Sequence, residues 1–493
     1  MEYFINCNEA PIAPLNMALS KDQAEHLYRR LGFSASVATI DSVNLQNSST
    51  IVDQLIDEAL NLAPIPAPEW ATWTRAEYPE DGDLRRPIVR AQIEEMQGAL
   101  ANSFFENNLR DRLSFFWSNH FVTELRVYDA PPFLYEYINC LQRNALGNFK
   151  TFLSEIGLTS AMLYYLDGAF NNNNSPNENY AREIYELFCL GEGNEYTEDD
   201  IVETAKALTG YVERGEVQWT PVTFRADRHD TGEKTILGQT GNWGYDDVIR
   251  ILFEQRPNEI STFICTKLYE FFVHPDTSDA PGNAETIISE MAQTFRTNDF
   301  EIAPVLRQLF KSQHFFNEYA MGVIIKSPFD VFVNLIKETS FTINESIVSG
   351  VVESSRLVGQ ELFNPIDVAG WQRDRTWINT NFLIGRWLTA EMTIELFWRN
   401  DPEEFRNFGI AATGAQGTTI GDPNVVAARI INKILPKGLL ADQIDTAIQI
   451  FREPFEDTNA YEDGTWSMLR DGAEQQVYLL LKHLVRQPEF QLK

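Results

Sequence analysis

Residues 175–191, with the sequence SPNENYAREIYELFCLG, carry the clearest helix signal in the chain. Ser175 is a typical N-cap, Pro176 fits the first helical position, and Glu178 follows three residues after the cap, as in a capping box. The glycine that closes the stretch is a typical helix terminator. The pattern therefore predicts a helix over 176–190.

Helical periodicity continues on both sides of this stretch, because apolar residues recur every three to four positions. The segments lie near 20–31, 50–62, 85–122, 131–155, 198–211, 244–256, 258–273, 283–297, 300–311, 326–340, 380–398, 423–434, 440–452 and 466–485. This distribution predicts an all-α fold, built as one large multi-helix globular body. We expect a single compact helical domain over 1–493.

Two regions depart from the helical pattern. Residues 212–238 alternate between apolar and polar side chains, with Gly and Asp between the runs, and predict a small β-hairpin insertion. Residues 406–422 are rich in Gly, Ala and Thr and predict a flexible loop. A C-terminal helical segment, 423–493, is expected to follow that loop.

Composition excludes some classes of function. The chain has 493 residues, of which 44% are hydrophobic, so a sizeable core can form. It has 40 Lys and Arg against 71 Asp and Glu, a formal net charge of −31. A protein this acidic repels nucleic acids and anionic lipid surfaces, and favours cations or basic partner surfaces. No run of 18 apolar residues predicts a transmembrane segment, and no secretory signal is visible in this chain.

One face of the predicted helix 176–190 is rich in charge. Glu178, Arg182 and Glu186 follow one another at intervals of four residues, the spacing of helical ion pairs. Asn179 and Glu183 form a second ridge beside them. This face fits two interpretations. It is either a solvated surface with salt bridges or a carboxylate cluster that holds a cation or performs acid–base chemistry.

Two further polar spots stand out. Asn119 and His120 end a very aromatic segment, 115–121, where a histidine is either a hydrogen-bonded core residue or a ligand or base. His229 and Asp230 lie in a turn of the predicted hairpin, where they are either a polar turn or an oriented base or metal ligand. The common nucleotide, serine-hydrolase and zinc-protease motifs are absent from the sequence.

These stretches resemble a bacterial family known only as domain of unknown function 1800. The matching blocks are HLYRRLGF at 26–33, FWSNHF at 116–121, ALGNF at 145–149, YLDG at 165–168, PNENYARE at 176–183, ALTG at 207–210, HDTGEK at 229–234, IKSP at 325–328 and VAGW at 368–371. The resemblance covers nearly the whole chain. One departure is Ile366, where relatives often carry a second proline after Pro365.

The resemblance implies an exported bacterial protein in the periplasm or outside the cell, although no signal is visible in this chain. It also implies a sulfatase-like or alkaline-phosphatase-like neighbouring protein as a partner, because such proteins are often encoded beside members of the family. No activity is tied to the family. Because the polar spots coincide with its most specific blocks, we expect them to meet in space as one site.

The leading interpretation is a hydrolase that uses a divalent cation, such as Ca²⁺, Mg²⁺ or Zn²⁺, and acts on an anionic or glycan substrate. The expected catalytic residues are Glu178, Glu183, His120, His229 and Asp230. The expected substrate-binding residues are Arg182, Lys234, Asn119 and Asn179. The expected metal ligands are Glu183, Glu186, His229 and Asp230.

The alternative is a non-enzymatic binding or assembly protein of the cell envelope. In that case the same side chains form a buried polar network that fixes how the helices pack. The two interpretations differ in geometry. An open concave pocket lined by these residues favours the enzyme, whereas a closed and fully paired network favours the alternative.

Overall fold

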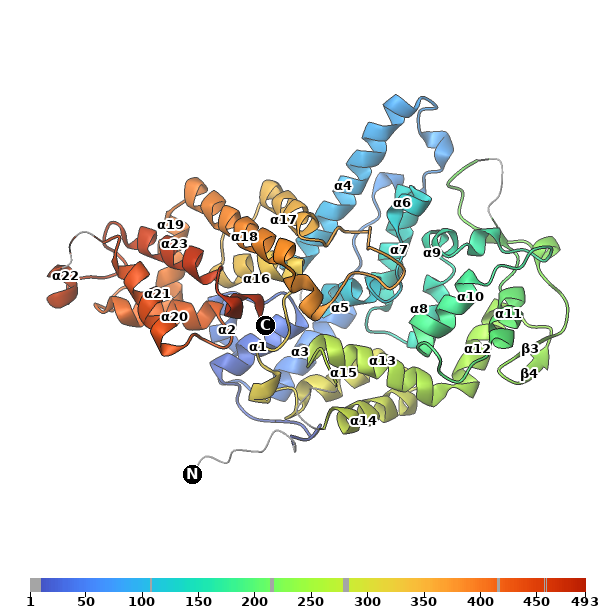
Figure 1. Ribbon diagram of the computed structural model, residues 1–493, viewed down its shortest axis with the longest axis horizontal. Coiled ribbons are helices and arrows are strands. Elements are labelled where there is room, and N and C mark those ends of the chain that lie inside the picture. Colours follow the sequence, from blue (N-terminus) through green and yellow to red (C-terminus); the bar gives the residue numbers. More distant parts are fainter. Residues whose placement is uncertain are drawn as a thin grey trace.

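Helices dominate the computed structural model (Figure 1). It describes residues 10–106, 109–212, 217–277, 283–414, 417–455, 457 and 459–493. In this part of the chain the strands form two small antiparallel sheets, so the predicted all-α class with a small β insertion is confirmed. Of the helices in these residues, none is both long enough and apolar enough to cross a membrane.

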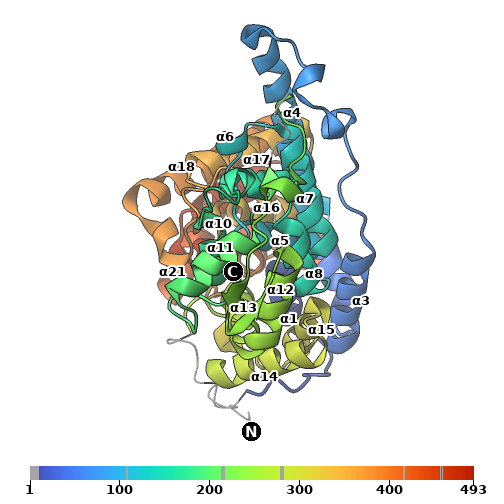
Figure 2. The ribbon, with the colours of Figure 1, turned by 90° about the vertical axis from the view of Figure 1, so that its right-hand side faces the viewer.

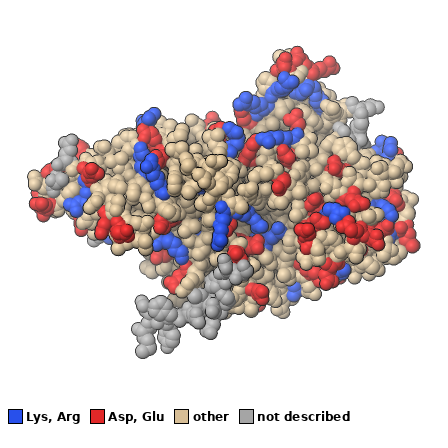
Figure 3. Space-filling view, viewed as in Figure 1, with Lys and Arg blue, Asp and Glu red and all other residues tan. Residues whose placement is uncertain are grey.

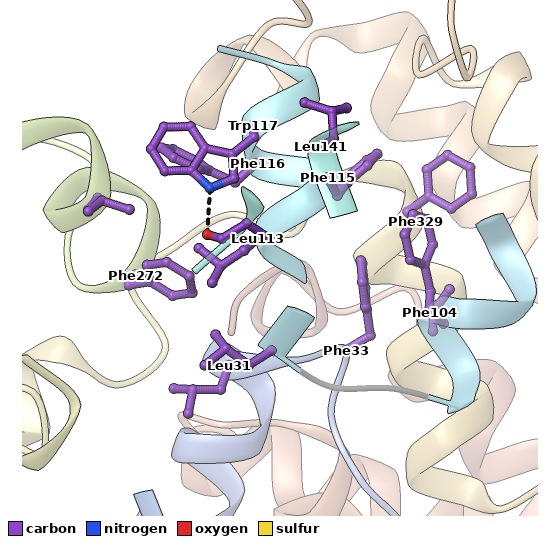
Figure 4. Packing of buried hydrophobic residues seen from close by; sticks show 14 of the residues in the cluster. Leu31, Phe33, Phe104, Leu113, Phe115, Phe116, Trp117, Leu141, Phe272 and Phe329 are labelled. Atoms are coloured by element: carbon purple, nitrogen blue, oxygen red, sulfur yellow. Dashed lines mark hydrogen bonds between the residues drawn. The ribbon is translucent and has the colours of Figure 1, made fainter. Parts of the chain in front are cut away.

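Two helices form the centre of the hydrophobic core, α5 (Leu109–Ser118) and α16 (Pro328–Thr339). Solvent reaches almost no side chain of either helix, so both must be covered on all sides. The rings of Phe115 and Phe329, with centroids 5.6 Å apart, join the two helices (Figure 4). The indole N–H of Trp117 is also buried there and donates to the carbonyl oxygen of Ala145 at 2.9 Å, so this polar atom keeps a partner.

Other helices surround this pair, and α4 extends beyond the body (Figures 1 and 2). Before the β structure they are α1 (Lys21–Leu31), α2 (Val37–Val43), α3 (Ser48–Asn61), α4 (Gly82–Glu106), α6 (Leu125–Tyr128), α7 (Pro131–Asn144), α8 (Phe149–Ile156), α9 (Ser160–Tyr165), α10 (Asn179–Glu183) and α11 (Glu198–Ala207). After it they are α12 (Tyr245–Gln255), α13 (Pro257–Phe272), α14 (Ala284–Thr297), α15 (Ile302–Lys311), α17 (Glu345–Leu357), α18 (Thr380–Asn400), α19 (Glu403–Thr413), α20 (Pro423–Ile434), α21 (Ala441–Arg452), α22 (Asn459–Glu462) and α23 (Ala473–Leu484).

Shorter helical turns connect these elements. The 3₁₀ turns are η2 (Glu69–Thr72), η3 (Arg75–Glu77), η4 (Gly168–Phe170), η6 (Ala226–Arg228), η7 (Glu318–Ala320), η8 (Asp374–Ile378) and η10 (Pro488–Gln491). One further element, η5 (Ile184–Cys189), is a π-helix that continues directly from α10. π-Helical turns are rare and are found most often near functional sites.

The β structure differs in detail from the single predicted hairpin. Strands β1 (Tyr211–Val212) and β2 (Thr223–Phe224) form one antiparallel pair, and β3 (Lys234–Ile236) and β4 (Gln239–Gly241) form another. The predicted insertion, 212–238, therefore spans one pair and half of the next. Its residues 213–216 lie outside the described part of the chain.

The predicted loop 406–422 is wrong over its first half, where α19 continues to Thr413. The apolar residues of this stretch, Phe408 and Ala412 among them, are buried against the C-terminal helices. Gly409 allows a close approach, because a Cβ atom there would lie 2.5 Å from the side chain of Met468. The small residues that suggested flexibility therefore serve helix packing. Residues 415 and 416 of the predicted loop lie outside the described residues.

A buried ion network sits where α5, α16 and the C-terminal segment meet. The carboxylate of Asp330 accepts from the guanidinium of Arg112 at 2.7 Å and from Lys493 Nζ at 2.6 Å, and all three side chains are about 2% exposed or less. The hydroxyl of Ser327 donates to the same carboxylate at 2.9 Å. Burial raises the pKa of Asp330, but the charges of Arg112 and Lys493 outweigh it and hold that pKa well below its ordinary value.

We predict that Asp330→Asn lowers the free energy of unfolding by about 3–5 kcal/mol, because it leaves two buried cations without their carboxylate. Combining it with Lys493→Met should recover part of that loss. Since the pKa of Asp330 is depressed in the folded state, its contribution is present above about pH 4 and is lost as the pH falls. Urea unfolding at pH 7 and at lower pH measures both effects.

The control for this prediction is Asp83→Asn, which removes an exposed partner of Arg86. That change should stay within about 0.5 kcal/mol. A loss of less than about 1 kcal/mol for Asp330→Asn would show that the buried network does not hold these elements together.

Candidate functional site

The helix that was expected to carry the site starts later than the sequence predicted. α10 begins at Asn179, and the capping box between Ser175 and Glu178 is not formed. Instead, the side-chain oxygen of Asn177 accepts from the backbone N–H of Asn179 at 2.9 Å. The N–H of Asn177 is in turn held by the side chain of Asn171 at 3.0 Å, so the chain enters the helix through an asparagine turn.

The first charged ridge of this helix is a paired surface network. Arg182 contacts Glu178 at 3.4 Å, Glu186 at 3.3 Å and Glu198 of α11 at 2.7 Å. The guanidinium is about one-third exposed, so the network lies at the surface. Arg182 therefore forms ion pairs with carboxylates of the protein itself and connects α10 to α11. Its guanidinium is not left unpaired for a substrate.

Glu183 differs from its neighbours because it is buried, with 9% of its surface exposed. Within the described residues, no Lys, Arg or His lies within ion-pair distance of its carboxylate. Burial and the nearby charge of Glu186 raise the pKa of Glu183 to about 7, against the opposing effect of Arg182. Such a carboxyl group changes protonation near neutral pH, which suits an acid–base role. Asn179, on the same ridge, donates to Asp167 at 3.3 Å and so fastens the helix to the preceding loop.

The polar groups of the turn around His229 form hydrogen bonds within the turn and with Thr209, just after α11. Nδ1 of His229 donates to the carbonyl oxygen of Thr209 at 2.9 Å, and the hydroxyl of Thr209 accepts from the backbone N–H of Asp230 at 2.7 Å. The side chain of Asp230 accepts from the N–H of Gly232 at 2.7 Å, so it does not orient His229 as expected. The buried Lys234 donates to the carbonyl oxygens of Asp230 and Gly232. Lys234 therefore holds the turn and not a substrate.

The expected metal ligands do not come together. Among the residues that the structure describes, no group of three or more His, Cys, Asp or Glu side chains is placed to hold a metal ion. Glu186 is paired with Arg182, and the carboxylate of Asp230 faces Lys234 at 3.6 Å. The ligand set of Glu183, Glu186, His229 and Asp230 is therefore not formed by this fold, because its members are held by other partners or on other elements.

His120 and Asn119 occupy a different place, at the end of α5. Nε2 of His120 donates to the carbonyl oxygen of Phe188, in the π-helical turn η5, at 3.1 Å. The three polar spots that were expected to form one site therefore come together only in part. His120 contacts the end of this helical segment, whereas the His229 turn contacts Asn173, in the loop before it, at 3.3 Å. Burial, together with the charge of Lys267, lowers the pKa of His120 well below its ordinary value, so its ring is neutral at pH 7.

Asn119 clamps the loop that contains the VAGW block. Its side-chain oxygen accepts from the N–H of Trp371 at 2.6 Å. Gly370 has a φ of +92°, and a Cβ atom there would lie 2.2 Å from that same oxygen. Only glycine fits this position, since both the backbone conformation and the close approach exclude a side chain. Asn119 therefore shapes the site through Trp371.

Both residues line a cavity of about 300 Å³, which we call the central cavity. It lies between α5, α13, residues 324–330 and residues 369–377. Three of the family-like blocks, FWSNHF, IKSP and VAGW, contribute to its lining. Its aromatic residues are Phe115, Phe116, Phe271, Trp371 and Trp377. Its charged residues are Arg112, Lys267, Glu270, Asp330, Arg373, Asp374 and Lys493.

Four cations and three carboxylates line this cavity, whereas acidic residues outnumber basic ones in the chain as a whole. On the face shown in Figure 3, Lys and Arg gather near the centre, whereas Asp and Glu cover the region of α10 to α12. Arg373 pairs with Glu270 at 3.3 Å. No carboxylate of the described residues pairs with Lys267. Burial and the charge of Arg373 lower the pKa of Lys267 to about 8.

Sequence reasoning did not find Lys267, Glu270 or Arg373. Lys267 and Glu270 lie on α13, inside an ordinary amphipathic pattern that gives them no local signal. Trp371 carried a signal, since it belongs to the VAGW block. The cavity becomes visible only when α13 and the 369–377 segment are placed against α5.

Comparison with known proteins gives one match. The model of a family described as a protein of unknown function, DUF1800, matches residues 26–492, which is nearly the whole chain. No curated protein and no solved structure matches. The resemblance seen in the sequence is thereby confirmed.

We predict that Glu183→Gln stabilises the folded protein at pH 8 by up to about 3 kcal/mol, because it removes a charge from a buried position. The pKa of Glu183 is raised in the folded state, so its contribution to stability is present below about pH 4 and is lost as the pH rises towards about 7. The variant and the wild type should therefore be equally stable at pH 4 and diverge above it. Denaturant unfolding at pH 4, 6 and 8 measures this difference.

Glu186→Gln is the matched control, since it removes a carboxylate from the same helix that does pair with Arg182. It should cost up to about 1 kcal/mol and show no gain at pH 8. A pH-independent loss for Glu183→Gln would refute the buried-charge account. A divalent cation that stabilises the wild type but not this variant would reinstate Glu183 as a metal ligand.

Proposed function

This chain belongs to the DUF1800 family of proteins of unknown function, and we propose that it binds an anionic, ring-bearing small molecule in the central cavity. The observation that carries the proposal is the placement of Lys267 and Arg373 beside an aromatic wall, in a chain whose net charge is −31. Cations that line a partly enclosed cavity attract anions, and stacked rings favour a flat or ring-shaped body. A carbohydrate acid or a phosphorylated ring has both features.

Buried charge behind the cavity supports the same conclusion. Seven buried Lys and Arg side chains and three buried carboxylates come from α1, α5, α16, α18, α20, the residues just before α16 and the C-terminal segment. The cations are Arg29, Arg30, Arg112, Lys326, Arg386, Lys433 and Lys493, and the carboxylates are Glu25, Asp330 and Glu338. An excess of buried positive charge is costly in a medium of low dielectric constant. An anion in the adjoining cavity lowers that cost.

Two of the buried cations have pKa values below their ordinary range. Burial and the charge of Arg112 lower the pKa of Arg30 to about 9. Burial lowers the pKa of Lys326 to about 8. Burial is the largest cause of both shifts, and neighbouring cations, Arg112 for Arg30 and Arg29 for Lys326, act in the same direction. A bound anion opposes these shifts, so binding is coupled to proton uptake.

The enzymatic and the structural interpretations of the sequence apply to two different parts of the molecule. His120 and Glu270 in the cavity are groups suited to acid–base chemistry, and hydrolysis of an anionic or glycan ligand is the reaction class that we favour for them. The Arg182 network and the closed His229 turn fit the structural alternative, because their polar atoms are paired within the protein.

Location and partner are part of the proposal and rest on the family resemblance. We propose that the protein works in the periplasm or outside the cell, beside a sulfatase-like or alkaline-phosphatase-like protein. Proteins of those two kinds act on anionic esters, the chemical class that the charges of the central cavity favour. None of the four residues expected to hold a divalent cation lines the central cavity. Binding there therefore does not depend on that ligand set.

Calorimetric titration tests the proposed function. Glucuronate, glucose 6-phosphate and pyridoxine 5′-phosphate are compared with glucose and pyridoxine. The anionic compounds should bind at least tenfold more tightly than their neutral counterparts at pH 6.5. Their affinity should fall as the pH rises through about 8, because Lys267 then loses its charge.

Lys267→Met should remove most of the preference for the anions. Lys150→Met is the control, because Lys150 lies on α8, pairs with Asp299 and does not line the central cavity. Equal binding of anionic and neutral compounds, or an unchanged preference in Lys267→Met, would refute an anion-binding cavity.

A further inference from the structure

Lys267 is placed in an unusual way for a lysine of this protein. It lies on α13, lines the central cavity and is partly accessible. Its Nζ atom stands 4.7 Å from the centre of the Phe263 ring, an apolar neighbour that does not neutralise its charge. Within the described residues no carboxylate lies within ion-pair distance of Nζ.

The other lysines near the core are held differently. Lys493 donates to Asp330 at 2.6 Å, and Lys234 donates to backbone carbonyl oxygens. Lys326 is fully buried behind the cavity. Lys337 resembles Lys267 most, but it donates to the carbonyl oxygen of Phe104 and does not line the cavity. Lys267 alone among these five combines access to the cavity with an unpaired amine.

We propose that Lys267 is a nucleophile that forms a Schiff base with an anionic aldehyde or ketone bound in the central cavity. The inference deepens the proposed function, because it names the reactive group of the same site and rests on anion binding there. Lysines that condense with carbonyl compounds are typically activated by an apolar pocket or by a second cation nearby. Phe263 and Arg373 supply these two conditions.

The chemistry requires no other reactant. The neutral amine of Lys267 adds to the carbonyl carbon, a C–N bond forms, and the π electrons of the carbonyl move to its oxygen. The resulting carbinolamine loses that oxygen as water, whose two hydrogens come from the amine, and a C=N bond remains. Glu270 lies three residues further along α13 and lines the same cavity, so it can relay the proton.

The protonation state of Lys267 agrees with this geometry. Burial and the charge of Arg373 lower its pKa to about 8, so part of the amine is neutral at physiological pH. An ordinary lysine, with a pKa near 10.4, is almost entirely protonated under those conditions. Arg373 keeps its positive charge at this pH, and its half-exposed guanidinium contacts Glu270 at 3.3 Å, so its remaining N–H groups can receive the anionic group of the ligand.

The test uses pyridoxal 5′-phosphate as the probe and sodium borohydride to fix the imine. Mass spectrometry of the digested protein then locates the adduct. We expect one main adduct, on Lys267, at low molar excess. At probe concentrations that saturate the site at each pH, its yield should rise with pH around a midpoint near 8. Lys267→Arg, which keeps the positive charge but removes the nucleophile, should reduce the yield of the main adduct at least tenfold.

Lys337→Arg is the matched control, because burial lowers the pKa of Lys337 to about 8 as well, but outside the cavity. This variant should react like the wild type. Adducts spread evenly over exposed lysines, or an adduct yield unchanged in Lys267→Arg, would overturn the inference.

Pyridoxine 5′-phosphate, which has an alcohol in place of the aldehyde, separates this inference from the proposed function. If it binds and pyridoxal 5′-phosphate forms no adduct on Lys267, the anion site stands and the nucleophile is refuted. If neither compound binds in the cavity, both are refuted for a phosphorylated ring. Binding of both, with the adduct on Lys267, supports both.

Discussion

The central constraint on this protein is the need to balance positive charge inside its core. Asp330 accepts from Arg112 on α5 and from Lys493 in the C-terminal segment, and it lies on α16. Three parts of the chain far apart in sequence therefore share one carboxylate. Because a buried charge must be paired, this contact fixes where the three elements lie relative to one another. The central cavity is the space that they leave beside α13.

The polar residues of the molecule fall into two groups according to whether their partners are internal. Arg182 and Lys234 are satisfied by carboxylates or carbonyl oxygens of the protein itself. Lys267 and His120 keep polar atoms at a cavity, where His120 is neutral and Lys267 is a weak base. The first group stabilises the arrangement of α10, α11 and the β strands. The second can act on a ligand, because no carboxylate of the described residues pairs with Lys267 and His120 is neutral.

Sequence patterns gave the helical class and most of the helices, because apolar periodicity reports directly on which face of a helix is buried. They missed α2, α6, α9 and α22, which are short, and also α17 and α19, although Ile347 and Val351 of α17 are buried. They also placed the start of α10 three residues early, since an asparagine turn replaced the expected capping box. The asparagine turn depends on a hydrogen bond to Asn171, which lies outside the helix.

The candidate site was less accessible to sequence reasoning. Asn119 and His120 were found because they stand out within an aromatic segment, and His120 does contact the predicted 176–190 segment, at Phe188. Lys267 is one lysine in an amphipathic helix, and its properties arise from Arg373, more than a hundred residues away. No local pattern encodes that contact. The carboxylates of the 176–190 segment looked functional because their spacing places them on one face. Spacing does not show whether those carboxylates form ion pairs within the protein.

The role proposed for the central cavity requires that anions enter it. A crystal of the protein soaked in bromide or iodide, with diffraction data collected to show the anomalous signal of the halide, locates anion sites without assuming a substrate. The account predicts the strongest halide peak in the central cavity, beside Lys267 and Arg373. Halides found only on exposed lysines and arginines, with none in that cavity, would contradict it.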